Sequence, residues 1–458
     1  MQIRLRILFA VLALVGLAAA PTAAIDFGGS LGNTTDVTVP SEGDTTLGQA
    51  NRLSLFVSHA FSDAWEIRGR ARYEYRLESV FADDTDTDVD WWRGDLDSLY
   101  VRGRVPQAEE AGYLVDMRFG RIRLREFSGA LLRERADGLR VAYQRPAVDL
   151  EFQAGYTGLL MKESSTLLLS NADVLDDSDE DVYLAPPRLL GVLGLSLPEL
   201  FARQTVDVSL VGQMDLREQV GEGVGLRVDR DLPDSEGPVH SAYGGLGVGG
   251  PVVSSLFYDV YGYYGWGLTT GADNGDYEET MIHSFLGGAN LQYFIPQAAQ
   301  SVVEAGYVFS SGDSDYQRFY EGNTDGTGSK FVGLSASSFG AVFSPRLGNL
   351  MVGRASYSIK PFANSGTRWL EELQTGLRGF GFFRPTDGPI SEGGLNPDSD
   401  ERYLGAEVDL VVNFRPFSDL GFSLVNGVFL PNAGNDAAFS DEVVGTEYKG
   451  SLTMTFSF

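Results

Sequence analysis

The last eleven residues, Tyr448 to Phe458, read YKGSLTMTFSF and decide the fold. Every second position is polar, and the positions between them are Tyr448, Gly450, Leu452, Met454, Phe456 and Phe458. A period of two is typical of a β-strand whose two faces meet different surroundings. In a soluble sandwich the apolar face packs on a core, whereas in an outer-membrane barrel it faces lipid and the polar face lines the lumen. Recurrence of this pattern, together with export of the chain, would favour the barrel.

The N-terminus has the pattern of a secretory signal peptide. Arg4 and Arg6 precede an apolar run from Ile7 to Ala20, and small residues follow up to Ala24. This pattern predicts a signal peptide over residues 1–24 and a mature chain over 25–458. The apolar run is too short for a spanning helix, and no later stretch reaches the roughly 18 apolar residues that such a helix needs.

The composition also favours a barrel. The 458 residues include 56 Gly, 20 Tyr and 28 Phe, yet hydrophobic residues make up only 43% and the mean hydropathy is -0.09. A barrel needs apolar residues at only every second strand position, so a low hydropathy is expected. The formal net charge of -28 disfavours nucleic acid as a partner. The absence of cysteine excludes disulfides and thiolate metal sites.

Segments with alternating polarity recur along the chain and are separated by turn residues. They predict about eighteen strands, with sixteen as the alternative count: 25–35, 49–60, 65–80, 94–105, 112–122, 137–145, 147–160, 188–199, 204–217, 239–250, 253–270, 280–295, 301–311, 348–361, 371–384, 401–415, 419–430 and 446–458. An even count returns both termini to the periplasm.

The predicted connections alternate in length, as short periplasmic turns and long outer loops would. The long loops are expected at 36–48, 81–93, 123–136, 161–187, 218–238, 271–279, 312–347, 385–400 and 431–445. To keep the alternation, 312–347 is one outer loop and 361–370 is a periplasmic turn. Loops of this length are unusual in a compact soluble domain.

The predicted strand at 65–76 indicates which face meets lipid and which face lines the lumen. Its odd positions run from Trp65 to Tyr75 and are apolar, aromatic or glycine, whereas its even positions are all Glu or Arg. An arginine facing lipid at the bilayer midplane costs about 2–4 kcal/mol, so the charged face is the lumen. The sequence therefore predicts an all-β fold, a transmembrane antiparallel β-barrel of the bacterial outer membrane.

Two of the predicted outer loops are strongly acidic. Asp83 to Asp90 reads DDTDTDVD, and Asp173 to Asp181 reads DVLDDSDED. Neither run has the glycine and terminal glutamate of a helix–loop–helix calcium site. Two interpretations of these runs stay open. They are solvated loops whose charges repel one another, or loops that bind calcium specifically. No metal site is predicted.

One sector of the predicted lumen is basic: Arg68, Arg70, Arg72, Arg76, Arg102, Arg104, Arg118 and Arg140. Guanidinium groups on paired strands could form a path for carboxylate, phosphate or sulfate groups, which the planar fork binds bidentately. The same arginines could instead brace the wall by pairing with lumen carboxylates, for which the candidates are Glu66, Glu74, Asp97, Asp116 and Glu151. One network could serve both roles.

Aromatic residues suggest two further roles. Tyr261 and Tyr263 share a face with Asp259 and are expected to point inward, where they could stack on a sugar ring or fill lumen volume. The chain ends on an aromatic residue, and Phe456 and Phe458 are expected to carry the signal that the barrel-assembly machinery recognises. Other aromatic residues fit lipid-facing girdles: Tyr143, Tyr156, Tyr258, Tyr264, Trp266 and Tyr448.

No feature of the sequence indicates an enzyme. The three histidines, His59, His240 and His283, are isolated, and no hydrolase, metalloprotease or nucleotide-binding motif occurs in the chain. Neither catalytic residues nor a cofactor are therefore predicted.

The C-terminal third resembles a known family. The run from Tyr403 to Leu410, followed by Phe414-Arg415-Pro416 and Phe429-Leu430-Pro431, is similar to the closing strands of the alginate-export family of outer-membrane porins. The resemblance implies an eighteen-stranded barrel. It also implies that lumen arginines guide a polyuronate outward, with the matching positions at Arg68, Arg70, Arg72, Arg102, Arg104, Arg118 and Arg140.

The sequence thus predicts a porin that passes small polar or anionic solutes, with an acidic oligo- or polysaccharide as one candidate. The alternative is a surface-exposed barrel that acts as an adhesin or ligand-binding protein through its acidic loops. A transporter for hydrophobic solutes is a third possibility, although residues 25–48 are too short and polar for a plug. The expected partners are outer-membrane lipid, the barrel-assembly machinery and the solute. A monomer is favoured over a trimer.

Overall fold

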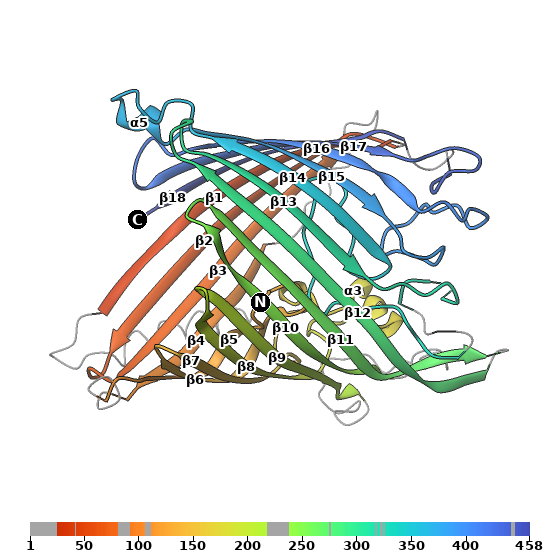
Figure 1. Cartoon of the computed structure of the whole chain (residues 1–458), viewed down its shortest axis with the longest axis horizontal. Helices are drawn as coiled ribbons and strands as arrows, with labels where there is room; N and C mark the ends of the chain where they lie inside the picture. Colours follow the sequence, from red (N-terminus) through yellow and green to blue (C-terminus); the bar gives the residue numbers. More distant parts are fainter. Residues whose placement is uncertain are drawn as a thin grey trace.

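A single sheet of eighteen antiparallel strands closes on itself to form a barrel (Figure 1). The computed structural model describes residues 25–41, 43–80, 92–105, 111–217, 238–273, 276–316, 318–320, 323, 326–440 and 445–458. Each strand pairs with the next in sequence, and β1 pairs with β18. The predicted signal peptide and the acidic run 83–90 lie outside the described residues.

The eighteen predicted segments each overlap one strand of the structure, so the higher of the two predicted counts is confirmed. The strands are β1 (Ile25–Val39), β2 (Thr46–Ala60), β3 (Trp65–Val80), β4 (Arg93–Arg104), β5 (Leu114–Arg125), β6 (Arg133–Arg145), β7 (Val148–Tyr156), β8 (Arg188–Phe201), β9 (Gln204–Asp215), β10 (His240–Val253), β11 (Leu256–Asp273), β12 (Asp276–Ile295), β13 (Ser301–Ser310), β14 (Leu350–Ile359), β15 (Gln374–Phe383), β16 (Tyr403–Phe414), β17 (Leu420–Pro431) and β18 (Glu447–Ser457).

The helical segments among the described residues are few and short. They are η1 (Lys162–Ser164), α3 (Asn171–Ser178) and α5 (Arg368–Glu371), which lies in the predicted turn between β14 and β15. Among the described residues, no helix has the length and apolar character needed to cross a membrane.

The alternation of side chains gives the barrel an apolar outer surface. On β16, Val408 and Leu410 point outward and are 48% and 46% exposed, whereas Glu407 and Asp409 point inward. Leucine, valine and aromatic side chains are exposed in the same way on strands all around the barrel. In a closed barrel the backbone N–H and C=O groups of every strand find partners on neighbouring strands, and an apolar outer face suits contact with lipid. The predicted transmembrane barrel is therefore confirmed.

The C-terminus closes the barrel against β1. The Phe458 N–H donates to the Gly29 carbonyl (3.0 Å), and the Gly29 N–H donates to the Phe458 carbonyl (2.9 Å). A Cβ atom at Gly29 would lie 2.6 Å from the Phe458 ring and 2.8 Å from the Ser54 carbonyl oxygen. Only glycine leaves room for this close approach.

Three predicted loops were drawn too long. The predicted loop 36–48 is mostly strand, because β1 reaches Val39 and β2 begins at Thr46. The predicted loop 271–279 is also mostly strand, because β11 reaches Asp273 and β12 begins at Asp276. The predicted loop 123–136 shortens to 126–132. In each case the pairing between strands continues through residues that were assigned to a loop because of their polarity.

Candidate functional site

The hairpin of β5 and β6 leaves the barrel wall and turns inward. The β4–β5 ladder ends where Leu99 pairs with Arg121, although both strands continue. Gly120 has a φ of +127°, and a Cβ atom there would lie 2.2 Å from the Leu99 carbonyl oxygen. Glycine therefore permits both the backbone conformation and the close strand contact at the point of departure.

The tip of this hairpin, residues 126–132, reaches across the lumen to β11. The Phe127 ring stacks on the Tyr263 ring, with centroids 5.4 Å apart and planes 17° apart. The Tyr263 hydroxyl donates to Glu126 and lies 3.1 Å from the Ser128 hydroxyl oxygen. Strands β7 to β10 separate the hairpin from β11 in the wall. The contact therefore spans the interior and narrows it.

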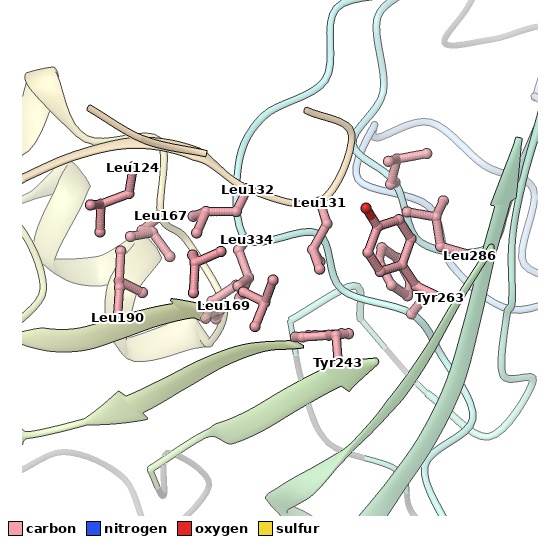
Figure 2. Close-up of a cluster of buried hydrophobic side chains, with 14 of the residues drawn as sticks. Leu124, Leu131, Leu132, Leu167, Leu169, Leu190, Tyr243, Tyr263, Leu286 and Leu334 are labelled. Carbon is pink, nitrogen blue, oxygen red and sulfur yellow. The ribbon is translucent and has the colours of Figure 1, made fainter. Parts of the chain in front are cut away.

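A hydrophobic core inside the barrel holds the hairpin in place (Figure 2). Leu124, Leu131 and Leu132 from the hairpin are fully buried, as are Leu167 from the β7–β8 loop and Leu190 from the wall. Each buried leucine contributes about 1.5–3 kcal/mol relative to an exposed one. Packing on this scale makes the inward position a fixed part of the fold.

The described part of the loop between β13 and β14, residues 311–349, also folds inward. The Tyr243 hydroxyl donates to the Val332 carbonyl (2.9 Å), and the Tyr243 ring packs edge-on against Phe331. The Arg133 N–H donates to the Ser335 hydroxyl (2.7 Å), which joins this loop to the β5–β6 hairpin. The prediction that 312–347 is one long loop is confirmed. Its described part packs inside the barrel, because its apolar residues find a core there.

The acidic run after residue 172 is only partly the solvated loop that the sequence suggested. Asp173 is fully buried in helix α3, where it forms a capping box with Ser170. It pairs with Arg188 (2.7 Å) and Arg217. Burial alone would raise the pKa of Asp173, but the two arginines outweigh it and lower the pKa. The solvated interpretation is thus wrong for Asp173. Among the described residues, no group of three or more carboxylates or histidines could hold a metal ion.

Six of the eight predicted lumen arginines form ion pairs with lumen carboxylates. The pairs are Arg68–Glu66 (2.9 Å), Arg72–Asp97 (3.6 Å), Arg76–Glu74 (2.6 Å), Arg102–Asp116 (2.5 Å), Arg118–Asp116 (3.0 Å) and Arg140–Glu151. The five carboxylates considered as bracing partners are all used. For these six side chains the contacts favour the bracing role.

A second set of arginines lies on the inward hairpin and was not predicted. They are Arg121, Arg123, Arg125, Arg133 and Arg135, which occupy alternate positions. Arg123 faces Arg135 and Arg125 faces Arg133 in register, whereas Arg121 faces Asp137 and pairs with it at 2.9 Å. Arg135 lies 3.3 Å from Asp95 and 3.1 Å from Asp97, and Arg121 lies 3.7 Å from Asp95. Asp95 and Asp97 on β4 also contact Arg72. This face of the hairpin is therefore turned toward the inner face of β3 and β4.

Part of this basic surface is not neutralised. Five exposed arginines make no ion pair with any residue that the structure describes: Arg70, Arg104, Arg123, Arg125 and Arg133. Three of them are on the inward hairpin, Arg70 is on β3 and Arg104 is the last residue of β4. Since each guanidinium keeps its charge at any physiological pH, these groups leave an excess of positive charge in this sector.

The two predicted inward tyrosines both point into the barrel, but their surroundings differ. Tyr263 is only 3% exposed and its ring is covered by Phe127, which favours the volume-filling role for this residue. Tyr261 is half-buried and packs edge-on against Tyr263. Phe456 and Phe458 are exposed on the outer face at the end of β18, with their rings stacked.

Comparison with solved structures identifies the fold. OccK8 (OprE) of Pseudomonas aeruginosa aligns with a TM-score of 0.57 and 13% identity over 95% of this chain and 98% of that chain. OccK7 (OpdD) of the same organism gives 0.55 and 12% over 95% and 98%, and OccK5 (OpdH) gives 0.53 and 12% over 94% and 98%. The chain has the fold of outer-membrane porins. The predicted outer-membrane location and non-enzymatic class agree with this fold.

The sequence comparisons do not assign this chain to a family. A scan against protein-family models finds no match, and a search of curated proteins finds none either. The structural neighbours are porins of the OccK and OprD group, and membership of the alginate-export family is not shown. The part of that resemblance that holds is the eighteen-stranded barrel.

Proposed function

We propose that this chain is an outer-membrane channel that passes small polar solutes and prefers anionic ones. The observation that carries the proposal is the row of exposed, unpaired arginines on the inward hairpin, at Arg123, Arg125 and Arg133. The hairpin crosses the interior and contacts β11, so its charge lies close to the path of a passing solute. Carboxylate and phosphate groups suit the planar guanidinium fork, and acidic sugars are one class that carries such groups.

The wall arginines support the proposal in a different way. Six of them are committed to ion pairs that brace the sheet, so their charge is largely neutralised by neighbouring carboxylates. Arg70 and Arg104 lack such partners among the described residues and would extend the basic surface along the wall. Selectivity would then depend on unpaired arginines on both hairpin and wall rather than on the number of arginines in the lumen.

The experiment is the reversal potential of the refolded barrel in a planar bilayer under a salt gradient. Wild type should be anion-selective, and the triple replacement of Arg123, Arg125 and Arg133 by glutamine should reduce this selectivity. Arg415→Gln is a matched control, because this exposed arginine lies in the turn between β16 and β17 and away from the hairpin. It should leave the reversal potential unchanged.

Two results would contradict the proposal. Cation selectivity of the wild type would mean that lumen carboxylates set the field, so the anionic preference would be wrong. No conductance at all would favour the alternative that the barrel is an anchor for loops that bind a ligand.

A further inference from the structure

The β13–β14 loop runs through the interior between two distant parts of the wall. On one side, the Val332 carbonyl accepts a hydrogen bond from the Tyr243 hydroxyl of β10 (2.9 Å). On the other side, the Phe343 ring packs on aromatic rings of β15 and β17. Between these points the Ser335 hydroxyl accepts a backbone N–H of the inward hairpin (2.7 Å). We call residues 331–343 the crossing segment.

The crossing segment is firmly held at its far side and in its middle. The Val342 N–H and the Phe343 N–H each donate to one carboxylate oxygen of Glu407 on β16, both at 2.8 Å. Hydrogen bonds from backbone N–H groups to a carboxylate are among the strong ones. Leu334 is fully buried among leucines of the hairpin and of the β7–β8 loop (Figure 2). The crossing segment therefore has a fixed place in the lumen.

The inward face of the wall from β8 to β13 is covered by these inward parts. Inward apolar side chains on this face belong to the buried core: Val192, Val211, Leu286 and Val308. Inward serines are buried as well, with exposed fractions of 3%, 6%, 1% and 0%: Ser209, Ser241, Ser284 and Ser310. In an open lumen these hydroxyl groups would meet water. We call this part of the wall the closed sector.

The inward face of β18, β1 and β2 is not covered in this way. No residue of these three strands belongs to either hydrophobic cluster that the described residues form. The Thr34 and Thr453 hydroxyl groups lie 3.0 Å apart across the pairing of β1 with β18. Inward side chains in the middle of the three strands are small, and none is buried: Gly32, Thr34, Ala50, Ser54, Ser451 and Thr453. We call this part of the wall the open sector.

The basic face of the hairpin borders the open sector. Arg135 on this face contacts Asp97 of β4 at 3.1 Å, so the face is turned toward β3 and β4. Strand β3 is the neighbour of β2 in the wall. The exposed Arg123, Arg125 and Arg133 thus lie on the side of the open sector, whereas the leucines on the opposite face of the hairpin pack in the core that covers the closed sector.

We propose that solutes cross the barrel along the open sector, and that Thr34 and Thr453 form the wall that limits the size of a passing solute. Their hydroxyl groups donate and accept hydrogen bonds without carrying a charge. The hairpin arginines therefore select for charge, and the wall of β18, β1 and β2 limits the width of the path. This inference rests on the proposed function for the existence of a conducting path and adds the place of that path.

The test uses the absence of cysteine from the sequence, because an introduced cysteine is then the only thiol. The full-length refolded barrel is treated with 2-sulfonatoethyl methanethiosulfonate, a small, negatively charged reagent that stays in water. Thr453→Cys should be modified roughly tenfold faster than the closed-sector variant Ser284→Cys, because the reaction requires access of the reagent to the thiol. Ser241→Cys is a second closed-sector variant, should Ser284→Cys fail to fold.

The second readout is the current of the same variants in a planar bilayer. Modification of Thr453→Cys should lower the single-channel current by about one third or more and shift the reversal potential toward cation selectivity, because a negative group then stands in the path. Leu452→Cys is the matched control, because this neighbouring side chain points outward and is 47% exposed on the lipid-facing side. Treatment of Leu452→Cys and Ser284→Cys should leave the current unchanged.

The inference is overturned if Thr453→Cys is modified without a change in current, or if a closed-sector variant reacts as fast and lowers the current. Cation selectivity of the wild type, together with a lower current after modification of Thr453→Cys, would contradict the anionic preference and leave the path in place. A barrel without conductance would contradict the proposed function, and slow modification of Thr453→Cys would then overturn the open sector as well.

Discussion

Replacing Arg188 by methionine should release helix α3 from the barrel wall. One Arg188 nitrogen lies 2.7 Å from an Asp173 oxygen and 3.0 Å from an Asp215 oxygen. The other donates to the Gln213 side chain (3.0 Å) and to the Val239 carbonyl (3.2 Å). Arg188 therefore ties the β7–β8 loop to β9 and to the residue before β10. Methionine is similar in length but has no donor, so both carboxylates would lose this cation.

The size of the effect follows from burial. The side chains of Arg188, Asp173 and Asp215 are all 0% exposed, so water cannot replace the lost contacts. Removing one member of a buried ion pair costs about 3–5 kcal/mol, because the remaining charge stays uncompensated. Arg217 still contacts Asp173, which favours the lower end of this range. A loss of this size should speed exchange in the loop by roughly a hundredfold to a few thousandfold.

The assay is native-state hydrogen exchange of the amides of α3. Glu372→Gln is the control, because the Lys360–Glu372 pair is partly exposed and should contribute only about 0–1 kcal/mol. Lowering the pH should have the same effect as the replacement. The arginines lower the pKa of Asp173 in the folded protein, so the stabilisation from its charge is fully present above the pKa of the unfolded state. This stabilisation is lost as the pH falls through the pKa of the folded state. If Arg188→Met changes α3 exchange no more than Glu372→Gln does, the buried cluster does not hold the loop.

Two further replacements test how the hairpin is placed. Tyr263→Phe keeps the stack on the hairpin tip but leaves Glu126 without its hydroxyl donor; a loss of about 1–3 kcal/mol should appear as larger fluctuations of the single-channel current, and a steady current would contradict this role. Gly120→Ala forces a side chain into a left-handed backbone conformation and against a carbonyl, so the yield of folded barrel should fall, whereas Gly212→Ala, with nothing within 4 Å, should fold normally. Equal yields would mean that the departure of β5 does not depend on glycine.

The barrel wall could be predicted from the sequence because lipid imposes a simple rule. A charged side chain cannot face lipid cheaply, and every second residue of a spanning strand does face it, so polarity alone reveals strands, faces and count. The rule ends where the strand leaves the lipid. Thr46 and Asp276 begin strands whose first residues have no clear alternation of polarity, and there the sequence assigned loops.

The interior could not be predicted in the same way, since a side chain in the lumen can meet water, a carboxylate or a folded loop. One signal was nevertheless available. Arg121, Arg123 and Arg125 occupy the outward parity of β5, where facing lipid would cost about 2–4 kcal/mol each. The alternation of three arginines therefore required that this part of β5 leave the lipid-facing wall. The spacing of Ser170 and Asp173, which form a capping box, likewise indicated a helix start within the acidic run.

The separation of paired from unpaired arginines also explains how a strongly acidic chain can have a basic sector inside it. Ion pairs such as Arg102–Asp116 neutralise the wall locally and link neighbouring strands, so they contribute to shape more than to the field. Arg123, Arg125 and Arg133 lie on a hairpin that is held by apolar packing on its opposite face, at Leu124, Leu131 and Leu132, and these three arginines have no carboxylate partner among the described residues. Their charge therefore stays available. Under this arrangement, replacing the hairpin arginines can reduce selectivity without lowering the free energy of unfolding. Replacing a paired wall arginine should lower the free energy of unfolding before it changes selectivity.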